Sequence, residues 1–250
     1  MLFHSSYTAL LTPFKDNQLD INAYRNLVDF QIENGTHGLV PVGTTGESPT
    51  LSHDEHKKLV EVCVEQANGR VPVIAGAGSN STSEAVDFVK HACAAGADGL
   101  LVVTPYYNKP TQSGLLAHYN ELIKNSSKPI IIYDIPGRSV IKMSDNTMAE
   151  LAKNDLIVGV KDATADLARP TRLQNLIGDD FIQLSGEDGT ALAYLAAGGH
   201  GCISVTANIA PNLLSRMHNA WKQGDITNAQ DINKKLMPLH DSLFLSLIHI

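Results

Sequence analysis

The sequence predicts an α/β fold and, within that class, a (β/α)8 TIM barrel. Eight short runs rich in Val, Ile and Leu recur along the 250-residue chain, and a helix-like segment follows each run. The runs are apolar throughout rather than at alternate positions, which is typical of strands buried on both faces of a parallel sheet. A doubly wound sheet is the competing architecture, and the count of eight β–α units favours the barrel.

The predicted strands are spread over the chain from its start to beyond residue 200. They cover residues 7–11, 38–42, 71–76, 98–104, 129–134, 156–160, 181–185 and 201–206.

Helix start and stop signals separate these strands. Asp20 is a candidate N-cap for a helix that ends at Gly35, and SHDE (52–55) and STSE (81–84) both have the pattern of a capping box. The second box is expected to open a helix that ends at Gly96. Further helices are predicted near residues 112–125, 144–153, 167–177, 188–197 and 211–222. We assign residues 1–224 to a barrel catalytic domain and residues 225–250 to the start of a C-terminal helical region.

The composition argues against several classes of protein. The net charge is −7 at pH 7, and Lys and Arg are scattered, which disfavours a nucleic-acid-binding surface. No apolar run reaches membrane-spanning length, and residues 1–14 lack the pattern of a signal peptide. Cys63, Cys93 and Cys202 fit neither a disulfide framework nor a zinc pattern. We therefore expect a cytoplasmic protein with no nucleic-acid or membrane partner.

Lys161 is the leading candidate for chemistry. The stretch LIVGVKDAT (156–164) places this lysine directly after a predicted buried strand. Burial in apolar surroundings disfavours a charged ammonium and so favours the free amine, the nucleophile that forms a Schiff base with a ketone. The alternative is a lysine that extends out of the strand end to pair with Asp162.

Chemically reactive segments also follow the other predicted strands, where a barrel builds its active site. They are GTTGES (43–48), GAGSNS (76–81), TPYYNKP (104–110), DIPGRS (134–139), SGED (185–188) and SVTAN (204–208). Their convergence on one barrel mouth favours the catalytic interpretation of Lys161. GTTGES offers backbone N–H groups and threonine hydroxyls that suit a carboxylate.

Two further side chains at the expected barrel mouth each have two interpretations. Tyr133 is either a core residue or a group that passes protons through its hydroxyl. Arg138 is either an ordinary exposed arginine or a bidentate partner for a substrate carboxylate.

The glycine-rich and histidine motifs do not predict a nucleotide or metal site. No Gly-Lys-Ser/Thr follows GTTGES, and Ser81 stands where a dinucleotide fingerprint needs its third glycine. His53 and His56 have helical i, i+3 spacing, but no third metal ligand is in view.

Five motifs together resemble the dihydrodipicolinate synthase family of pyruvate-dependent class I aldolases: GTTGES, TPYYNKP, YDIPGRS, GVKDAT and GGHGCISVTAN. The resemblance is collinear from about residue 2 to Phe244. It implies a lyase of lysine and diaminopimelate biosynthesis that condenses pyruvate with L-aspartate 4-semialdehyde to 4-hydroxy-tetrahydrodipicolinate. It also implies a barrel with a small C-terminal helical domain, a homotetramer built as a dimer of dimers, and no metal or organic cofactor.

The resemblance assigns catalytic roles by position. Lys161 is similar to the family's Schiff-base lysine, and Tyr133 to the tyrosine that relays protons. Thr44 and Tyr107 match the other members of the hydroxyl relay, whose second tyrosine crosses from a neighbouring subunit.

The resemblance implies substrate contacts in the same way. Thr45 matches a contact to the pyruvate carboxylate, and Gly186 and Ile203 match residues that line the same pocket. Arg138 matches the arginine that receives the carboxylate of aspartate semialdehyde.

The resemblance further implies feedback inhibition by L-lysine at a dimer interface. Glu84 is expected to bind the α-amino group of the inhibitor and the histidines its side-chain amine; helix capping by Glu84 is the alternative. The positions that match are Ser48, His53, His56, Asn80, Glu84 and Tyr106.

Two positions depart from the family pattern. Asp134 replaces the usual asparagine and is expected to place an extra acid near the site, while Pro49 occupies a small-residue position of the feedback site. The strength of lysine inhibition therefore stays open.

Two rival functions follow from the same scaffold. One is a pyruvate lyase or aldolase that acts on sialic or sugar acids, and the other is a non-catalytic barrel homologue. Arg138 argues against the first, and the joint presence of Lys161, Tyr133, Thr44 and Arg138 argues against the second.

The last six residues, LSLIHI (245–250), are expected not to be native sequence. The match to the family breaks after Phe244, and LSLIHI is a direct translation of CTGTCTCTTATACACATC, the end of a transposon-based sequencing adaptor. On this interpretation the helical extension is truncated, and apolar surface near Leu236, Leu243 and Phe244 is left uncovered.

Overall fold

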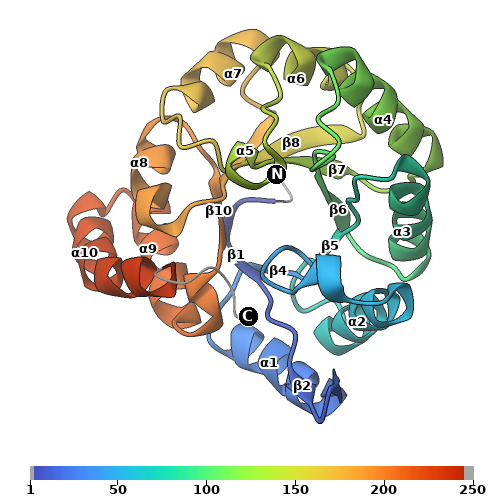
Figure 1. Cartoon of the computed structure of the whole chain (residues 1–250). Coiled ribbons are helices and arrows are strands. Elements are labelled where there is room, and N and C mark those ends of the chain that lie inside the picture. The colour runs from blue at the N-terminus through green and yellow to red at the C-terminus, as the bar shows by residue number, and fades with distance from the viewer. Residues whose placement is uncertain (1–2, 245–250) are drawn as a thin grey trace.

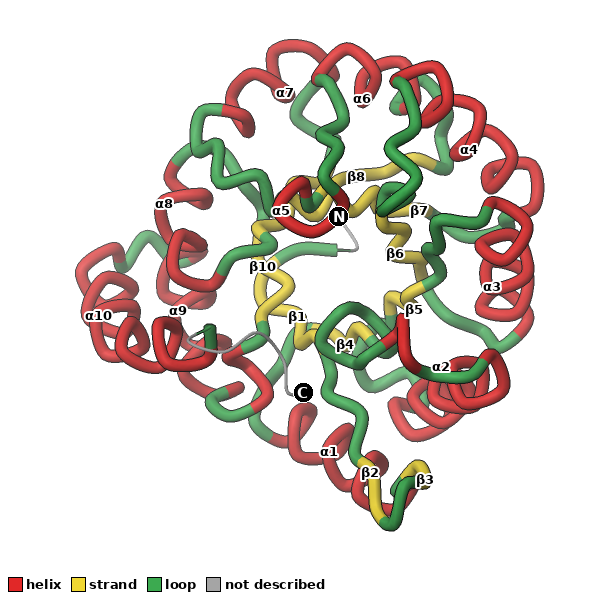
Figure 2. Tube along the Cα trace, viewed as in Figure 1, coloured by secondary structure: helices red, strands yellow, loops and turns green. Residues whose placement is uncertain are grey.

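The centre of the molecule is a ring of parallel strands. The structure, a computed structural model, describes residues 3–244. The strands pair in the order β4-β1-β10-β9-β8-β7-β6-β5, and a parallel bridge between Leu39 and Val73 closes the ring between β4 and β5. Figure 2 shows this ring with the helices around it. The strands are β1 (Ser5–Ala9), β4 (Gly38–Val40), β5 (Ile74–Gly76), β6 (Gly99–Val103), β7 (Ile130–Asp134), β8 (Ile157–Asp162), β9 (Ile182–Ser185) and β10 (Gly201–Ser204).

Helices surround the ring on its outer side (Figure 1). They are α1 (Ile21–Glu33), α2 (His53–Ala67), α3 (Thr82–Ala94), α4 (Gln112–Asn125), α6 (Asp145–Leu151), α7 (Arg169–Ile177), α8 (Ala191–Ala196) and α9 (Pro211–Lys222). The smaller elements are a hairpin of β2 (Phe14–Lys15) and β3 (Gln18–Leu19), the helix α5 (Pro136–Ser139), and the 3-10 turns η1 (Ser48–Thr50), η2 (Asp188–Thr190) and η3 (Thr206–Asn208). The predicted fold class, a TIM barrel, is confirmed.

Most strands are rich in apolar residues because both of their faces are buried. In β7, Ile131 and Tyr133 point into the barrel interior, whereas Ile130 and Ile132 pack against the helical layer. Alternation along a strand therefore separates two cores in one run of residues. Tyr133 reaches the inner space at the strand's carboxyl end.

Lys161 lies within a strand rather than after one. The predicted strand ends at residue 160, but β8 continues through Lys161 and Asp162. The reason is hydrogen-bonded pairing on both sides, with Lys161 opposite Tyr133 of β7 and opposite Leu184 of β9. The backbone of the lysine is thus fixed from two directions.

The predicted helix caps are formed in two cases and incomplete in the third. Asp20 accepts a hydrogen bond from the Ala23 backbone at 2.9 Å, and Ser52 and Glu55 form a reciprocal capping box. Ser81 caps α3, but the carboxylate of Glu84 bonds elsewhere and does not return to the cap. The prediction of a second complete capping box is therefore wrong.

The helix α10 (Ile226–Leu243) packs against α9. Ile232 and Leu236 join Leu214 and Met217 in one apolar cluster, and His240 bonds the Thr206 hydroxyl at 2.7 Å. The expectation that Leu236 is uncovered is wrong, because its exposed fraction is 1%. Figure 1 shows α10 outside the ring of barrel helices.

Apolar surface is exposed at the end of α10, as expected, because the exposed fraction of Phe244 is 41%. Residues 245–250 lie outside the described residues, so the expectation about their origin stays a prediction. Across residues 3–244, no helix is both long and apolar enough to span a membrane.

Candidate active site

Lys161 and Tyr133 meet inside the barrel at the carboxyl ends of two adjacent strands. The lysine Nζ lies 4.2 Å from the centroid of the Tyr133 ring, and each residue is 5% exposed. The alternative pairing of Lys161 with Asp162 does not occur. Successive residues of a strand point to opposite faces, and Asp162 instead accepts a bond from the Thr164 backbone at 2.9 Å and lies 3.6 Å from Arg169.

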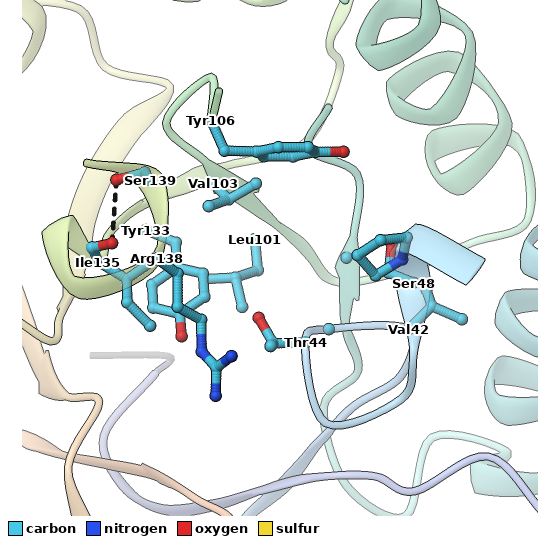
Figure 3. Close-up of a pocket in the computed structure, with 14 residues that line it drawn as sticks. Val42, Thr44, Ser48, Leu101, Val103, Tyr106, Tyr133, Ile135, Arg138 and Ser139 are labelled. Atoms are coloured by element: carbon cyan, nitrogen blue, oxygen red, sulfur yellow. Dashed lines mark hydrogen bonds between the residues drawn. The ribbon is translucent and has the colours of Figure 1, made fainter. Parts of the chain in front are cut away.

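Two adjoining cavities open at this end of the barrel. The first, of about 290 Å³, contains Lys161, and the second has about 300 Å³. Thr44, Tyr133, Ile135 and Arg138 line both. In Figure 3 the Tyr133 hydroxyl, the Thr44 side chain and the Arg138 guanidinium all point into the shared space. The structure therefore brings together three polar groups that the sequence places in two separate segments, beside the buried lysine.

The loop after β4 supplies the threonines. It is held by a bond from the Glu47 backbone to the Thr44 carbonyl at 3.1 Å and by the Thr12 hydroxyl, which donates to the Gly46 carbonyl at 2.6 Å. Thr44 is half-buried and Thr45, which lines the Lys161 cavity, is 6% exposed. These two hydrogen bonds fix the backbone of the loop, and with it the positions of Thr44 and Thr45.

Arg138 is presented by α5, one turn of helix that follows β7. The Ser139 hydroxyl donates to the Ile135 carbonyl at 2.9 Å and secures this turn. The Arg138 side chain is exposed at the rim while it lines both cavities. A guanidinium at this position can donate two parallel hydrogen bonds to a carboxylate that enters from solvent.

Gly186 leaves the space that the lysine occupies. Its backbone N–H donates to the Asp162 carbonyl at 2.7 Å, and a Cβ at this position would lie 3.3 Å from Lys161 Cε and 2.8 Å from Ala163 Cβ. A side chain here would therefore crowd the side chains of Lys161 and Ala163.

Glu187 is a cavity residue to which sequence reasoning gave no role. Its side chain is half-buried and lines the Lys161 cavity. Burial raises the pKa of this carboxyl above its usual value, while the charges of Lys161 and Arg138 act in the opposite direction. The available signal was an acid directly after a strand, in the SGED segment. Leu243 and Phe244 also line this cavity, and no motif in the sequence indicated that.

Two of the predicted catalytic and substrate-binding residues lie outside both cavities. Ile203 is completely buried in the barrel interior, and Tyr107 is 86% exposed with a φ of 69°. Neither lines the space next to Lys161. Tyr107 is therefore not part of a hydroxyl relay within a single copy of the chain.

The expectation that Asp134 places an extra acid near the site is wrong. Asp134 alternates with Tyr133 and points to the outer face, where its exposed fraction is 0%. Arg169 Nη1 donates to its carboxylate at 2.7 Å, and the Met143 backbone donates at 3.3 Å. Burial raises the pKa of Asp134, and Arg169 opposes that rise.

Three of the six residues predicted for lysine binding, His53, His56 and Glu84, lie on α2 and α3. Glu84 accepts a bond from the Ser79 hydroxyl, and its other oxygen lies 2.6 Å from His53 Nε2. His56 is 2% exposed and stacks on Phe88 with the ring centroids 4.0 Å apart. Among residues 3–244, neither ring nitrogen of His56 has a hydrogen-bond partner.

The other three predicted residues lie at the surface and the second cavity. Ser48 and Tyr106 line the second cavity, and Asn80 donates to Asn108 at 3.4 Å. In the part of the chain that the structure describes, no group of three His, Cys, Asp or Glu side chains is arranged to hold a metal ion.

Comparison with known proteins gives one consistent family. The model of the dihydrodipicolinate synthetase family matches residues 2–250. The chain is 60% identical to a 4-hydroxy-tetrahydrodipicolinate synthase of Bradyrhizobium diazoefficiens, over 97% of this chain and 82% of the relative. It is 62% identical to the enzyme of that name from Rhodopseudomonas palustris, with the same two coverages.

Solved structures agree with this result. Dihydrodipicolinate synthase from Aquifex aeolicus has a TM-score of 0.96 and 43% identity, covering 98% of this chain and 84% of its own. A chloride-inhibited dihydrodipicolinate synthase from Acinetobacter baumannii, complexed with pyruvate, has a TM-score of 0.94 and 42% identity. The match covers 97% of this chain and 84% of that one. A synthase from Cyanidioschyzon merolae with lysine bound has a TM-score of 0.94 and 36% identity. The match covers 98% of this chain and 84% of that one.

Proposed function

The chain belongs to the dihydrodipicolinate synthetase family, and from that membership and the barrel mouth we propose its reaction. It condenses pyruvate with L-aspartate 4-semialdehyde to give 4-hydroxy-tetrahydrodipicolinate, as a class I aldolase-type lyase of lysine and diaminopimelate biosynthesis. The observation that carries the proposal is a buried Lys161 amine over the Tyr133 ring, in a cavity rimmed by Arg138. That arrangement occurs in a chain about 60% identical to enzymes of this name.

Imine formation comes first. The Lys161 amine attacks the ketone carbon of pyruvate, and the carbinolamine loses its hydroxyl as water when a proton reaches that oxygen. The Tyr133 and Thr44 hydroxyls face the shared cavity and are the groups assigned to carry this proton. The Thr45 hydroxyl and the neighbouring backbone are assigned to the pyruvate carboxylate.

Carbon–carbon bond formation follows from the imine. Loss of a methyl proton gives an enamine, whose carbon attacks the aldehyde carbon of the second substrate. Arg138 holds that substrate's carboxylate at the rim, so the aldehyde end faces inward. The substrate's own amine then attacks the imine carbon, closes the ring and releases Lys161.

Trapping with borohydride tests this mechanism. Reduction in the presence of pyruvate should add one reduced pyruvate adduct, and peptide mass mapping should locate it on Lys161. The Lys161→Ala variant should give no adduct. A stable adduct on another lysine of the wild-type chain would contradict the proposal.

The rival function, cleavage of sialic or sugar acids, is not favoured. The relatives that match the chain over nearly its whole length carry the synthase name, and a rim guanidinium suits a second substrate with a carboxylate close to its aldehyde. Turnover of a sialic acid at a rate near that with aspartate semialdehyde would revive the rival. The non-catalytic alternative fails if the borohydride adduct forms.

We further propose that the enzyme works as a homotetramer, a dimer of dimers, and that Tyr107 completes the relay of a neighbouring copy. An exposed tyrosine held at a positive φ at the end of a loop supports this role. Sedimentation should show the tetramer. Mixing Tyr107→Phe with Lys161→Ala chains should restore part of the activity that each variant lacks.

Inhibition by L-lysine is part of the same proposal. Its support is the contact between Glu84 and His53, together with the relative whose structure contains lysine. Release of inhibition in Glu84→Ala tests it. We also propose the cytoplasm as the compartment, because all three cysteines are unpaired; fractionation of cells tests that.

A further inference from the structure

The cavity around Lys161 contains two opposite charges near its rim. Arg138 and Glu187 both line it, the first from the turn after β7 and the second from the segment after β9. The Ser185 hydroxyl fixes the glutamate's backbone, because it accepts from the Glu187 N–H at 3.1 Å and donates to the Glu187 carbonyl at 3.0 Å. Glu187 thus has a fixed backbone and shares the cavity with the Arg138 guanidinium and the Lys161 amine.

The neighbouring acid, Asp188, differs from Glu187 because its carboxylate already accepts several hydrogen bonds from the protein. It is 2% exposed and accepts bonds from the Ser204 hydroxyl, from Val205 N at 2.8 Å and from Thr206 N at 3.1 Å. Asp188 therefore holds the loop after β10. Glu187 is the acid of this segment whose side chain faces the cavity.

The second substrate in the proposed reaction carries the complementary pair of charges. L-Aspartate 4-semialdehyde has an α-carboxylate and an α-ammonium on the same carbon, two bonds away from its aldehyde carbon. The Arg138 guanidinium alone can bind only the carboxylate of this substrate. The α-ammonium is then left without a partner. An unpaired charge in a partly buried site is unfavourable.

We infer that Glu187 binds the α-ammonium of the amino-acid aldehyde and accepts its proton before ring closure. This inference rests on the proposed function and extends it from the carboxylate to the amino group. Together, Arg138 and Glu187 select an aldehyde with both groups over one with a carboxylate alone.

The proton transfer balances as follows. One N–H bond of the ammonium breaks, its proton moves to a Glu187 oxygen, and the nitrogen keeps the electron pair. That pair forms the new bond to the imine carbon, whose π electrons move to Lys161 Nζ. The ring nitrogen then passes a second proton to Nζ, and the C–N bond to Lys161 breaks with its electrons on Nζ as the ring nitrogen's pair forms the ring C=N bond. The raised pKa of the carboxyl makes Glu187 a better proton acceptor than an ordinary exposed glutamate.

Two aldehydes and two variants test the inference. Succinate semialdehyde keeps the carboxylate and the aldehyde but lacks the amino group. The enzyme is loaded with pyruvate, mixed with either aldehyde and reduced with borohydride, and the mass of the adduct is followed against aldehyde concentration. Glu187→Gln should raise the half-saturating concentration of aspartate semialdehyde about 10- to 150-fold, as expected for a charge-assisted hydrogen bond, and leave that of succinate semialdehyde unchanged.

Arg138→Gln is the matched control, and it should weaken both aldehydes equally because both carry the carboxylate. Glu187→Asp keeps the charge and should restore most of the preference for the amino aldehyde. An equal effect of Glu187→Gln on both aldehydes, or none on either, overturns the inference. If the wild type forms no pyruvate adduct on Lys161, the proposed function itself fails.

Discussion

The position of the Lys161 amine depends on the absence of a side chain at Gly186 as well as on the Tyr133 ring. Lys161 lies against the Tyr133 ring on one side and against the bare backbone of Gly186 on the other. The side chain therefore runs in a narrow channel, where one added methyl group would change its path.

Gly186→Ala tests this channel. The new Cβ would lie 3.3 Å from Lys161 Cε and 2.8 Å from Ala163 Cβ, and overpacking of this kind costs about 1–3 kcal/mol. We expect imine formation with pyruvate to slow by about 5- to 150-fold, measured as the rate of borohydride-trapped adduct. Gly189→Ala is the control, since the nearest atom to its Cβ is Met237 Sδ at 3.9 Å. Equal rates for the two variants would contradict the steric explanation.

At the scale of elements, a buried arginine joins the two strands that carry the reactive pair. Arg169 is 0% exposed and donates to Asp134 of β7, to Asp145 at 2.9 Å and to the Met143 carbonyl at 2.8 Å. It also lies 3.6 Å from Asp162 of β8. The helix α7 is therefore tied to the outer side of both strands, directly behind Tyr133 and Lys161.

Arg169→Met should destabilise the fold strongly. It leaves Asp134 and Asp162 buried without their cation, and breaking a buried ion pair costs about 3–5 kcal/mol. The midpoint of urea unfolding measures the loss. Arg172→Met is the matched control, because Arg172 is 46% exposed and its two carboxylate partners are partly solvated, so about 0–1 kcal/mol is expected. A loss as small for Arg169 as for Arg172 would show that the buried cluster contributes little.

Structural features that depend on residues close together in the chain could be predicted from the sequence. The Ser52–Glu55 capping box and the Asp20 cap depend on residues three positions apart, and both were predicted. The second box failed because Ser79 and His53 compete for Glu84, and no local pattern reveals that competition. The extension of β8 to Lys161 likewise depends on pairing with strands distant in sequence.

The candidate site divides in the same way. The post-strand motifs identified the residues that share the cavities, including Thr44, Tyr133 and Arg138. Spacing could not tell that Asp134 faces outward to a buried arginine. Nor could it show that Glu187 faces the lysine, or that the end of α10 reaches the cavity.

For the whole molecule, buried histidines set the response to acid. Burial lowers the pKa of His56 and of His118 to about 4, and that of His218 to about 3. In the unfolded chain these groups titrate near pH 6.5. Below that pH the unfolded chain binds more protons than the folded chain, so stability falls as the pH falls.

The thermal midpoint should therefore be nearly constant above pH 7 and drop steadily from about pH 6.5 toward pH 4. Differential scanning calorimetry at pH 7.5, 6 and 5 measures this. His218→Leu removes one of these buried protonation sites and should make the slope shallower over that range. A midpoint that stays level down to pH 5 would show that these histidines bind protons in the folded state.

Leu243 and Phe244 form part of the wall around Lys161, yet they are the last residue and the C-cap of α10, which packs against α9 (Figure 1). The wall of the site is thus formed in part by the end of a helix, whereas the strands form a hydrogen-bonded ring. Fraying of one helical turn exposes few apolar contacts and needs far less free energy than opening the ring. A ligand that contacts this wall stabilises the last turn of α10 by mass action. Substrate affinity and the stability of that turn are therefore linked quantities.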